Sequence, residues 1–367
     1  MKKIVIALGA ASMTLLAACG SGGQSDARGT SAAPAAVGKL IDEYEAAVGN
    51  THPDIAIKPI SKPAPSGKTL EVITCAVPIC ALYTEGATKA AQALGWKTKT
   101  VVASFTPEGF KETWDTVLQD KPDAVVMAGV VPTDTVIDQV TQANEQGIVV
   151  VGYGLDVQAG GDSPFTFGTT SAKALSVDGR EQGLAVINDA KGATDVLIVN
   201  DPAQVPTKAQ VAASTEVLKS VGSRVALLKV SSSEIGKGVP AQIVTNLQAN
   251  PGVKYVLLPN DDFLSGVPQA LKSAGLDHVK VVGEAASEES KAALENGQLL
   301  ASTAHPVLIN GWYLVDAIVR KMVGDPIADA NPMWESVIVT RDNVDDLGNL
   351  SEWPHIQAEF TSAWNIG

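Results

Sequence analysis

The chain has 367 residues, of which 45% are hydrophobic and 18% are charged, and its formal net charge at pH 7 is −13. This composition is typical of a packed globular protein with more than one domain, and it disfavours disorder, collagen and a polytopic membrane protein. The negative charge also disfavours a nucleic-acid partner, because the phosphate backbone would be repelled.

Residues 1–18 are predicted to be an export signal. Two lysines precede an apolar stretch over residues 4–16, which is too short for a stable membrane-spanning helix. The run Leu16-Ala17-Ala18-Cys19 resembles the lipobox of bacterial lipoproteins, in which cleavage leaves a lipidated N-terminal cysteine. A plain secretory signal is the alternative. We expect an extracytoplasmic protein, anchored to the cell membrane as a lipoprotein through Cys19.

Residues 19–67 are predicted to be a tether after the lipidated cysteine. Residues 20–38 contain almost no large side chain, so burial cannot offset the entropy of ordering them. Apolar residues Leu40, Ile41 and Tyr44 then recur at helical spacing, which favours a short amphipathic helix before a Pro-rich stretch.

From Thr69 onward, short apolar runs alternate with longer amphipathic segments. This alternation predicts an α/β fold with parallel sheets and helices on both faces, and the number of strands favours two sheets. The predicted strands span residues 70–74, 98–103, 124–128, 148–152, 195–199, 225–230, 253–258, 280–283, 299–303 and 336–340. Helices are expected over residues 263–274 and 309–322, among others.

Open α/β sheets bind ligands beyond the carboxyl ends of their strands, so the loops there are the candidates for a functional site. These loops contain no GxGxxG, Walker A, HExxH, GxSxG or zinc-type spacing. No nucleophile with a base and no catalytic carboxylate pair stands out. We therefore expect no enzyme activity, no catalytic residue, no metal site and no cofactor.

Several segments occur in a characteristic order: Glu85-Gly86-Ala87, then the runs at residues 121–126, 143–150, 259–262 and 281–283. Together they resemble the type I periplasmic binding proteins of the ribose-binding family, the substrate-binding components of ABC importers. The resemblance extends from about Lys68 to Pro326. It implies two Rossmann-like lobes joined by a three-crossover hinge, with a ligand trapped between them by hinge closure.

On this resemblance, the first lobe comprises residues 68–170 and 304–332, and the second comprises residues 171–303 and 333–367. The C-terminal aromatic residues Trp353, Phe360 and Trp364 are then expected to pack on the second lobe.

The resemblance also implies ligand-binding positions, several of which are substituted. Val77-Pro78-Ile79-Cys80 stands where sugar binders have Asn-Pro and two aromatic residues, and Gly154-Leu155 stands where they have Asp-Arg. Asn260 matches the family's ligand-binding asparagine, and His305 replaces a glutamine. The expected ligand-binding residues are Pro78, Cys80, Tyr83, Tyr153, Asp156, Asn260, Asp261, Glu284 and His305.

Two of these residues have an alternative role. Asp261 could equally cap a helix, and His305 could equally be a hinge histidine bonded to the backbone.

Cys75 and Cys80 are the only thiols left once Cys19 is lipidated, and a disulfide between them is favoured outside the cytosol. Two free buried thiols are the alternative.

The sequence thus predicts a lipid-anchored, monomeric substrate-binding protein that captures a small solute for an ABC permease in the membrane. A sugar or polyol is favoured by the resemblance. A weakly polar or aromatic molecule is the alternative, because the loops have lost polar side chains. An exported ligand sensor for a signalling receptor is the alternative role for the protein.

Overall fold

A computed structural model describes residues 34–49, 56–104, 106–204, 207–305, 307–330, 336–348, 350 and 354–366. The export signal, the lipobox cysteine and Trp353 lie outside the described residues. Within them the chain forms two α/β lobes, each built on its own parallel sheet, as the sequence predicts.

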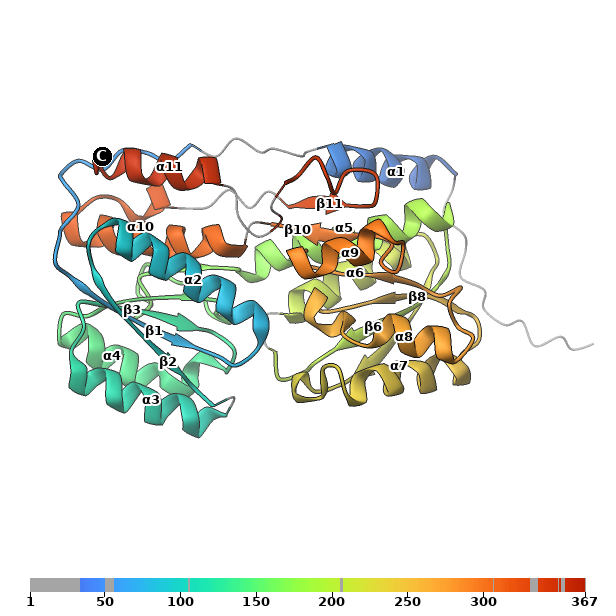
Figure 1. The fold of residues 1–367 in the computed structure, drawn as a ribbon, viewed down its shortest axis with the longest axis horizontal. Coiled ribbons are helices and arrows are strands. Elements are labelled where there is room, and N and C mark those ends of the chain that lie inside the picture. Colours follow the sequence, from blue (N-terminus) through green and yellow to red (C-terminus); the bar gives the residue numbers. More distant parts are fainter. Residues whose placement is uncertain are drawn as a thin grey trace, which may run out of the picture. The chain divides into compact units, whose positions relative to one another are not determined.

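The first lobe contains a five-stranded sheet. Its strands are β1 (Thr69–Thr74), β2 (Lys97–Val102), β3 (Ala124–Ala128), β4 (Val149–Tyr153) and β5 (Phe167–Thr169), in the order β2-β1-β3-β4-β5. Its helices are α2 (Pro78–Ala93), α3 (Pro107–Asp120), η1 (Thr133–Val136), α4 (Ile137–Glu145), α10 (Val307–Val323), η4 (Ile327–Ala330) and α11 (Pro354–Ala363). Figure 1 shows α2 and α10 on one face of the sheet and α3 and α4 on the other. Because both faces are covered, β1 and β3 are almost wholly buried, and β3 consists of apolar residues alone.

The second lobe contains a four-stranded sheet. Its strands are β6 (Asp195–Asn200), β7 (Arg224–Lys229), β8 (Val253–Leu257) and β9 (Lys280–Val282), in the order β7-β6-β8-β9. Its helices are α1 (Pro34–Gly49), α5 (Ala172–Ala190), α6 (Thr207–Ser220), η2 (Ser232–Glu234), α7 (Gly238–Ala249), η3 (Asp261–Leu264), α8 (Val267–Ser273) and α9 (Glu288–Glu295). The antiparallel pair β10 (Ser302–Ala304) and β11 (Val337–Val339) completes this lobe.

The predicted strands are found with shifts at their ends. The largest shift is at the strand expected over residues 299–303, which is β10 and begins only at Ser302. The helix expected over residues 263–274 is broken into η3 and α8, because Gly266 adopts a left-handed φ of 77° between them. The three-residue strand β5 was not predicted, since so short a run leaves no periodic signal.

The short amphipathic helix expected within residues 19–67 is found as α1, but it packs on the protein and is not part of a free tether. Helix α1 begins at Pro34, and its apolar side chains, among them Leu40 and Tyr44, pack against the core of the second lobe. Farther along, Ile60 is buried in the first-lobe core, and its N–H donates to the carbonyl of Ala363 at 3.0 Å. This segment therefore contacts both lobes.

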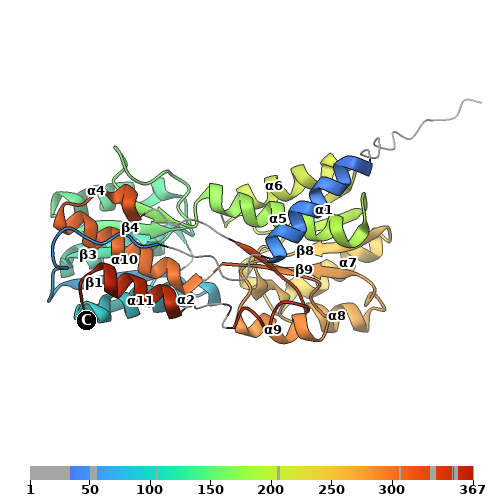
Figure 2. The same cartoon turned by 90° about the horizontal axis from the view of Figure 1, so that it is seen from above.

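The assignment of the C-terminal aromatic residues to the second lobe is also wrong. Phe360 and Trp364 are fully buried in the first-lobe core, where Trp364 stacks on Trp312 of α10 with ring centroids 5.7 Å apart. The indole N–H of Trp364 also donates to Asp316 Oδ1 at 2.7 Å. Figure 2 shows α11 beside α10, whereas α1 lies with α5 of the second lobe. An apolar helix at the end of a chain can cover either lobe equally well, so its sequence does not identify its partner.

Candidate functional site

Two tyrosines predicted to bind ligand meet in the first lobe. Tyr153 ends β4, and Tyr83 lies on α2, whose Pro78 begins the helix directly after the first loop. Their rings stack with centroids 4.1 Å apart and planes 2° apart, and the Tyr83 hydroxyl lies 2.7 Å from Thr170 Oγ1. Burial raises the pKa of both hydroxyls, so both stay protonated. We call Tyr83 and Tyr153 the tyrosine pair.

The loop that joins β1 to α2, which we call the first loop, is closed by a disulfide between Cys75 and Cys80, whose Cα atoms are 5.7 Å apart. Both cysteines are buried, and the Cys80 carbonyl accepts a hydrogen bond from Thr84 Oγ1 at 2.8 Å. The same loop reaches the second lobe, because the Ile79 N–H donates to Asp262 Oδ2 at 3.2 Å. The loop is thus held rigid where it contacts the other lobe.

Asn260 and Asp261 have structural roles after β8. The Asn260 side chain caps η3 by accepting from the Asp262 N–H at 3.1 Å. Asp261 accepts from the Glu284 N–H at 3.0 Å and from Ser302 Oγ at 2.9 Å, so it joins the loops after β8 and β9 to β10. Desolvation nevertheless raises the pKa of Asp261 to about 7.

Asp156 bonds to another loop of the first lobe. It is exposed, and its Oδ1 accepts from the Thr133 N–H at 3.0 Å and from Thr133 Oγ1 at 2.5 Å. This pattern is that of a cap on η1, and the structure gives Asp156 no contact with the tyrosine pair.

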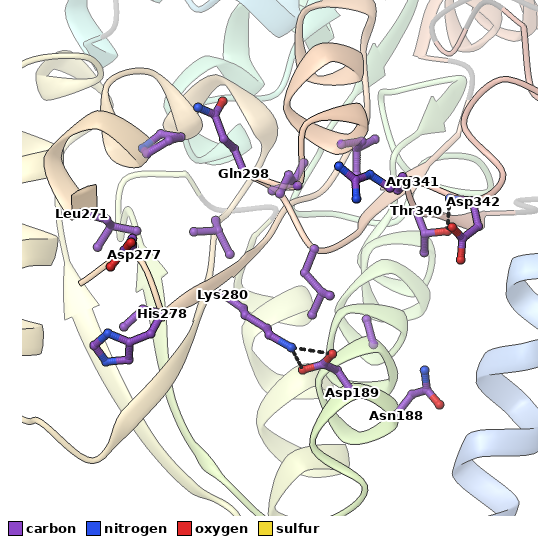
Figure 3. Close-up of a pocket in the computed structure, with 18 of the residues that line it drawn as sticks. Asn188, Asp189, Leu271, Asp277, His278, Lys280, Gln298, Thr340, Arg341 and Asp342 are labelled. Carbon is purple, nitrogen blue, oxygen red and sulfur yellow. Dashed lines mark hydrogen bonds and ion pairs between the residues drawn. The ribbon is translucent and has the colours of Figure 1, made fainter. Parts of the chain in front are cut away.

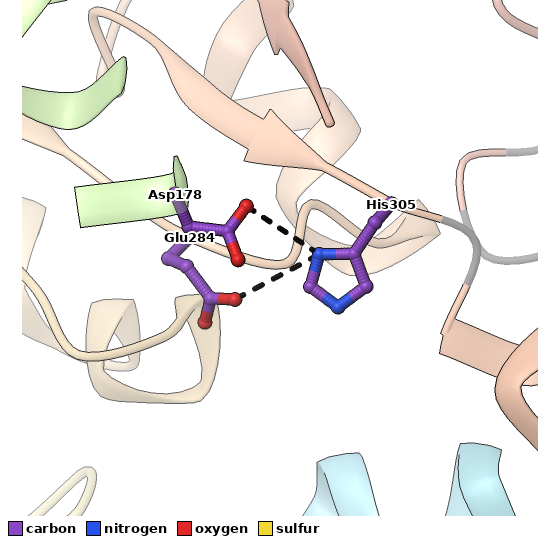
Figure 4. Close-up of side chains that lie close together, drawn as sticks. All are labelled: Asp178, Glu284 and His305. Atoms are coloured by element: carbon purple, nitrogen blue, oxygen red, sulfur yellow. Dashed lines mark ion pairs between the residues drawn. The ribbon is translucent and has the colours of Figure 1, made fainter. Parts of the chain in front are cut away.

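The remaining predicted residues, Glu284 and His305, meet a third side chain that was not predicted, Asp178 of α5 (Figure 4). His305 Nδ1 lies 3.7 Å from Asp178 Oδ1 and 3.9 Å from Glu284 Oε1. The exposed fractions of Asp178, Glu284 and His305 are 0%, 4% and 2%. We call these three residues the acid–histidine cluster.

The electrostatics of the cluster reflect its burial. Desolvation, and next the charge of Asp178, raise the pKa of Glu284 well above its ordinary value. Ala285, which follows Glu284, packs in the same core cluster as the tyrosine pair of the other lobe, and the charges of Glu284 and Asp178 contribute to the raised pKa of Tyr83. Aromatic, carboxylate and imidazole groups from both lobes therefore converge.

Helix α5 positions Asp178 through its close packing on α6. A side chain at Gly179 would place its Cβ 2.1 Å from the carbonyl oxygen of Gln210, so only glycine permits this approach. Gln182, one turn after Asp178, donates to the carbonyls of Leu258 and Gly283 at 2.8 and 3.0 Å. The helix is thus fixed to the loops that follow β8 and β9.

Asp178 and Gln182 were missed by the sequence analysis, although a signal was present. Both residues fall at helical spacing from Ala174, Leu175 and Ala185 on the buried stripe of α5. A carboxylate on such a stripe is unusual, because burying an ionised group is costly. Testing each predicted helix for charges on its apolar face would have found Asp178.

A separate pocket of about 760 Å³ lies on the second lobe (Figure 3). Its walls include Asn188, Asp189, Lys280 and Arg341, and Lys280 Nζ contacts Asp189 Oδ2 at 2.6 Å. Lys280 begins β9, whereas Glu284 follows the end of that strand. None of the predicted ligand-binding residues lines this pocket.

Among the helices that the structure describes, none is both long enough and apolar enough to cross a membrane.

Comparison with known proteins identifies a family for this arrangement. Residues 78–326 match a family model described as periplasmic binding protein domain. The fold is similar to a 5-methylthioribose transporter solute-binding protein from Thermotoga lettingae, with a TM-score of 0.69, 18% identity and coverage of 83% of this chain and 99% of that chain.

Two further solved structures share the fold. One is a sugar ABC transport substrate-binding protein from Bordetella parapertussis, with a TM-score of 0.67, 19% identity and coverage of 82% and 96% of the two chains. The other is an ABC transporter solute-binding protein from Agrobacterium vitis with bound allitol, with a TM-score of 0.65, 18% identity and coverage of 77% and 98%.

Proposed function

Because the chain belongs to the periplasmic binding protein family, whose members bind solutes without catalysing a reaction, we propose that it is the lipid-anchored substrate-binding component of an ABC importer. It captures a small solute between its two lobes and presents the closed form to a permease. The observation that carries this proposal is the convergence of the tyrosine pair with the acid–histidine cluster of the opposite lobe.

The burial of these groups supports hinge closure as the way in which the solute is held. Tyr83, Tyr153, Glu284 and His305 are each at most 4% exposed. A solute can reach them only when the lobes separate and the hydrogen bond from Ile79 to Asp262 opens. The described form then corresponds to the closed state, and opening is the step that admits the solute.

A sugar or polyol is the solute class that these side chains favour. The carboxylates of Asp178 and Glu284 are strong acceptors for hydroxyl groups, and the tyrosine pair offers an apolar face for a carbon skeleton. The relatives with bound allitol and 5-methylthioribose carry ligands of this kind. The apolar side chains of Val77 and Ile79 favour the alternative, a weakly polar or aromatic molecule.

A thermal-shift screen of the full chain in detergent tests this proposal. The panel contains pentoses, hexoses, polyols, nucleosides and small aromatic acids, and a molecule that binds only the native state raises the Tm. A sugar or polyol hit supports the proposal. A hit confined to the aromatic acids would favour the alternative solute class, a weakly polar or aromatic molecule. The absence of any hit would contradict the proposal that the protein binds a solute of this kind.

Site variants then place the solute. Tyr153→Ala removes one ring of the tyrosine pair and is expected to weaken binding of the hit at least tenfold by calorimetry, and Asn260→Ala is expected to weaken it as well. Tyr255→Ala is the matched control, because Tyr255 is a buried tyrosine of β8 whose hydroxyl bonds Asp189 at 2.5 Å, outside the site. Equal effects at Tyr153 and Tyr255 would remove the site assignment.

The anchor and the partner need their own measurements. We expect Cys19→Ser to release the protein from the membrane fraction, and intact-mass analysis of the native protein to show the added lipid. A pull-down of the solute-loaded protein is expected to recover an ABC permease. Recovery of a signalling receptor in its place would favour the sensor.

A further inference from the structure

The acid–histidine cluster brings three metal-binding groups together from distant parts of the chain. Asp178 comes from α5, Glu284 from the loop after β9, and His305 from the end of β10. One potential ligand atom from each residue lies within 4.8 Å of the other two. Figure 4 shows the two carboxylates and the imidazole pointing toward one another.

Among the described residues, no lysine or arginine pairs with the two carboxylates of the cluster, and His305 is the only basic residue that forms an ion pair with Asp178 or Glu284. Both oxygens of Asp178 are buried, and neither has a hydrogen-bond partner in the part of the chain that the structure describes. A fully buried carboxylate without hydrogen bonds is costly to maintain, which points to a cation that completes the site.

We propose that Asp178, Glu284 and His305 bind a divalent transition-metal ion, for which Zn²⁺ is the reference. One oxygen of each carboxylate and one imidazole nitrogen are the ligands. With metal–ligand bonds of about 2.1 Å, a tetrahedral site places its ligand atoms about 3.4 Å apart. The two separations from His305 Nδ1, 3.7 and 3.9 Å, need to contract by a few tenths of an ångström, and the two carboxylate oxygens already lie within 4.8 Å of each other.

The ligand types select the class of metal. Imidazole is a preferred ligand of Zn²⁺, Ni²⁺, Cu²⁺ and iron, whereas Ca²⁺ and Mg²⁺ prefer sites made of oxygen atoms. Three protein ligands leave at least one coordination position for another group. A hydroxyl or carboxylate oxygen of the captured solute fits that position, which would make the metal ion part of the solute site. This last step rests on the proposed function, whereas metal binding itself does not.

Calorimetric titration of ZnCl2 into the full chain, after treatment with a chelator, tests the metal site. We expect one saturable site per chain. Asp178→Asn and His305→Gln are expected to weaken Zn²⁺ binding at least tenfold, the loss typical of a damaged metal site. Glu181→Gln is the matched control, because Glu181 is a buried carboxylate on the same helix and is not one of the three ligands, and it should leave the affinity unchanged.

A second measurement on the native protein does not depend on how the variants fold. Anomalous diffraction from crystals grown with Zn²⁺ should place the ion between the three side chains. No saturable binding to the native chain, equal affinity in all variants, or an anomalous peak elsewhere would each overturn the metal site.

Chelation separates this inference from the proposed function. If the solute found by the thermal-shift screen binds equally well with and without chelator, coordination of the solute by the metal is wrong and the proposed function stands. If Zn²⁺ binds at the cluster and no solute of any class binds, the proposed function fails and the metal site stands.

Discussion

At the scale of single residues, Glu181 shows how burial couples charge to stability. Its side chain is 7% exposed on α5, and desolvation, followed by the charge of Asp178, raises its pKa to about 8 from an ordinary value of 4.5. Between about pH 4.5 and about pH 8, Glu181 therefore keeps its proton in the folded protein and loses it in the unfolded chain. The contribution of Glu181 to the free energy of unfolding is present below about pH 4.5 and is lost as the pH rises through about 8.

We therefore predict that the free energy of unfolding falls less steeply between about pH 5 and about pH 8 in Glu181→Gln than in the native protein. The amide cannot ionise, so it removes this pH-dependent loss. Urea unfolding followed by circular dichroism at both pH values measures the two slopes. Identical slopes in the two proteins would mean that Glu181 is ionised in the folded state.

The residue scale is also where sequence reasoning succeeded least. It carried Tyr83, Tyr153, Glu284 and His305 over from the family's ligand positions, and the structure brings these four near one another, although their binding role remains a prediction. Asp156 was carried over in the same way, and it accepts from the Thr133 N–H at the start of η1, so its binding role also remains a prediction. A position carried over from a family does not indicate whether a side chain turns toward the opposite lobe or back to its own backbone.

At the scale of elements, the contact between α2 and α10 depends on two glycines. A Cβ at Gly86 would lie 1.9 Å from the carbonyl oxygen of Leu308, and one at Gly311 would lie 2.1 Å from the backbone nitrogen of Ala87. Backbone atoms cannot move aside as a flexible side chain can, so the two helices would have to separate.

We predict that Gly86→Ala lowers the free energy of unfolding by about 2 kcal/mol or more, as overpacking of a tight interface does. Gly38→Ala is the control, because Gly38 lies in α1 with nothing within 4 Å of its added Cβ. Alanine favours a helix by up to about 1 kcal/mol over glycine, so the control should be neutral or stabilising. Equal losses in both variants, measured by urea unfolding, would show that helix propensity and not packing is responsible.

The bounds of α10 could be predicted, but its contact with α2 could not. Helical spacing of apolar residues predicts a helix over residues 309–322, close to the observed Val307–Val323. Gly86 and Gly311 are more than two hundred residues apart in the sequence, and no local sequence pattern indicates that the two helices contact each other at these glycines. The helix expected over residues 263–274 failed for a local reason, since Gly266 and the proline after it interrupt the pattern.

At the scale of the whole molecule, the two ends of the described chain lie on opposite lobes. Helix α1 packs on the second lobe, and α11 packs on the first, although the sheets of these lobes occur in the reverse order along the sequence. The alternation of strands and helices predicted an α/β fold with two parallel sheets, the family resemblance implied two lobes, and the fold is confirmed. The alternation carried no information about the terminal helices, which lie outside the alternating pattern.

We predict that deletion of residues 354–367 destabilises the first lobe selectively. The deletion removes Phe360 and Trp364, both fully buried against Trp312. Hydrogen exchange should quicken in β1, β3 and β4, while the second-lobe strands β6 and β8 keep their protection. Faster exchange in the second lobe alone would show that the C-terminal helix α11 stabilises the second lobe and not the first.

The position of α1 has a mechanical consequence for a protein held to a bilayer. Between the proposed anchor at Cys19 and Pro34 there are about fifteen residues, which reach at most about 50 Å when fully extended. Since α1 packs on the second lobe, an anchor at Cys19 would keep that lobe within this distance of the membrane surface. If the lobes open and close as proposed, the first lobe would move relative to a second lobe that is tethered near the bilayer.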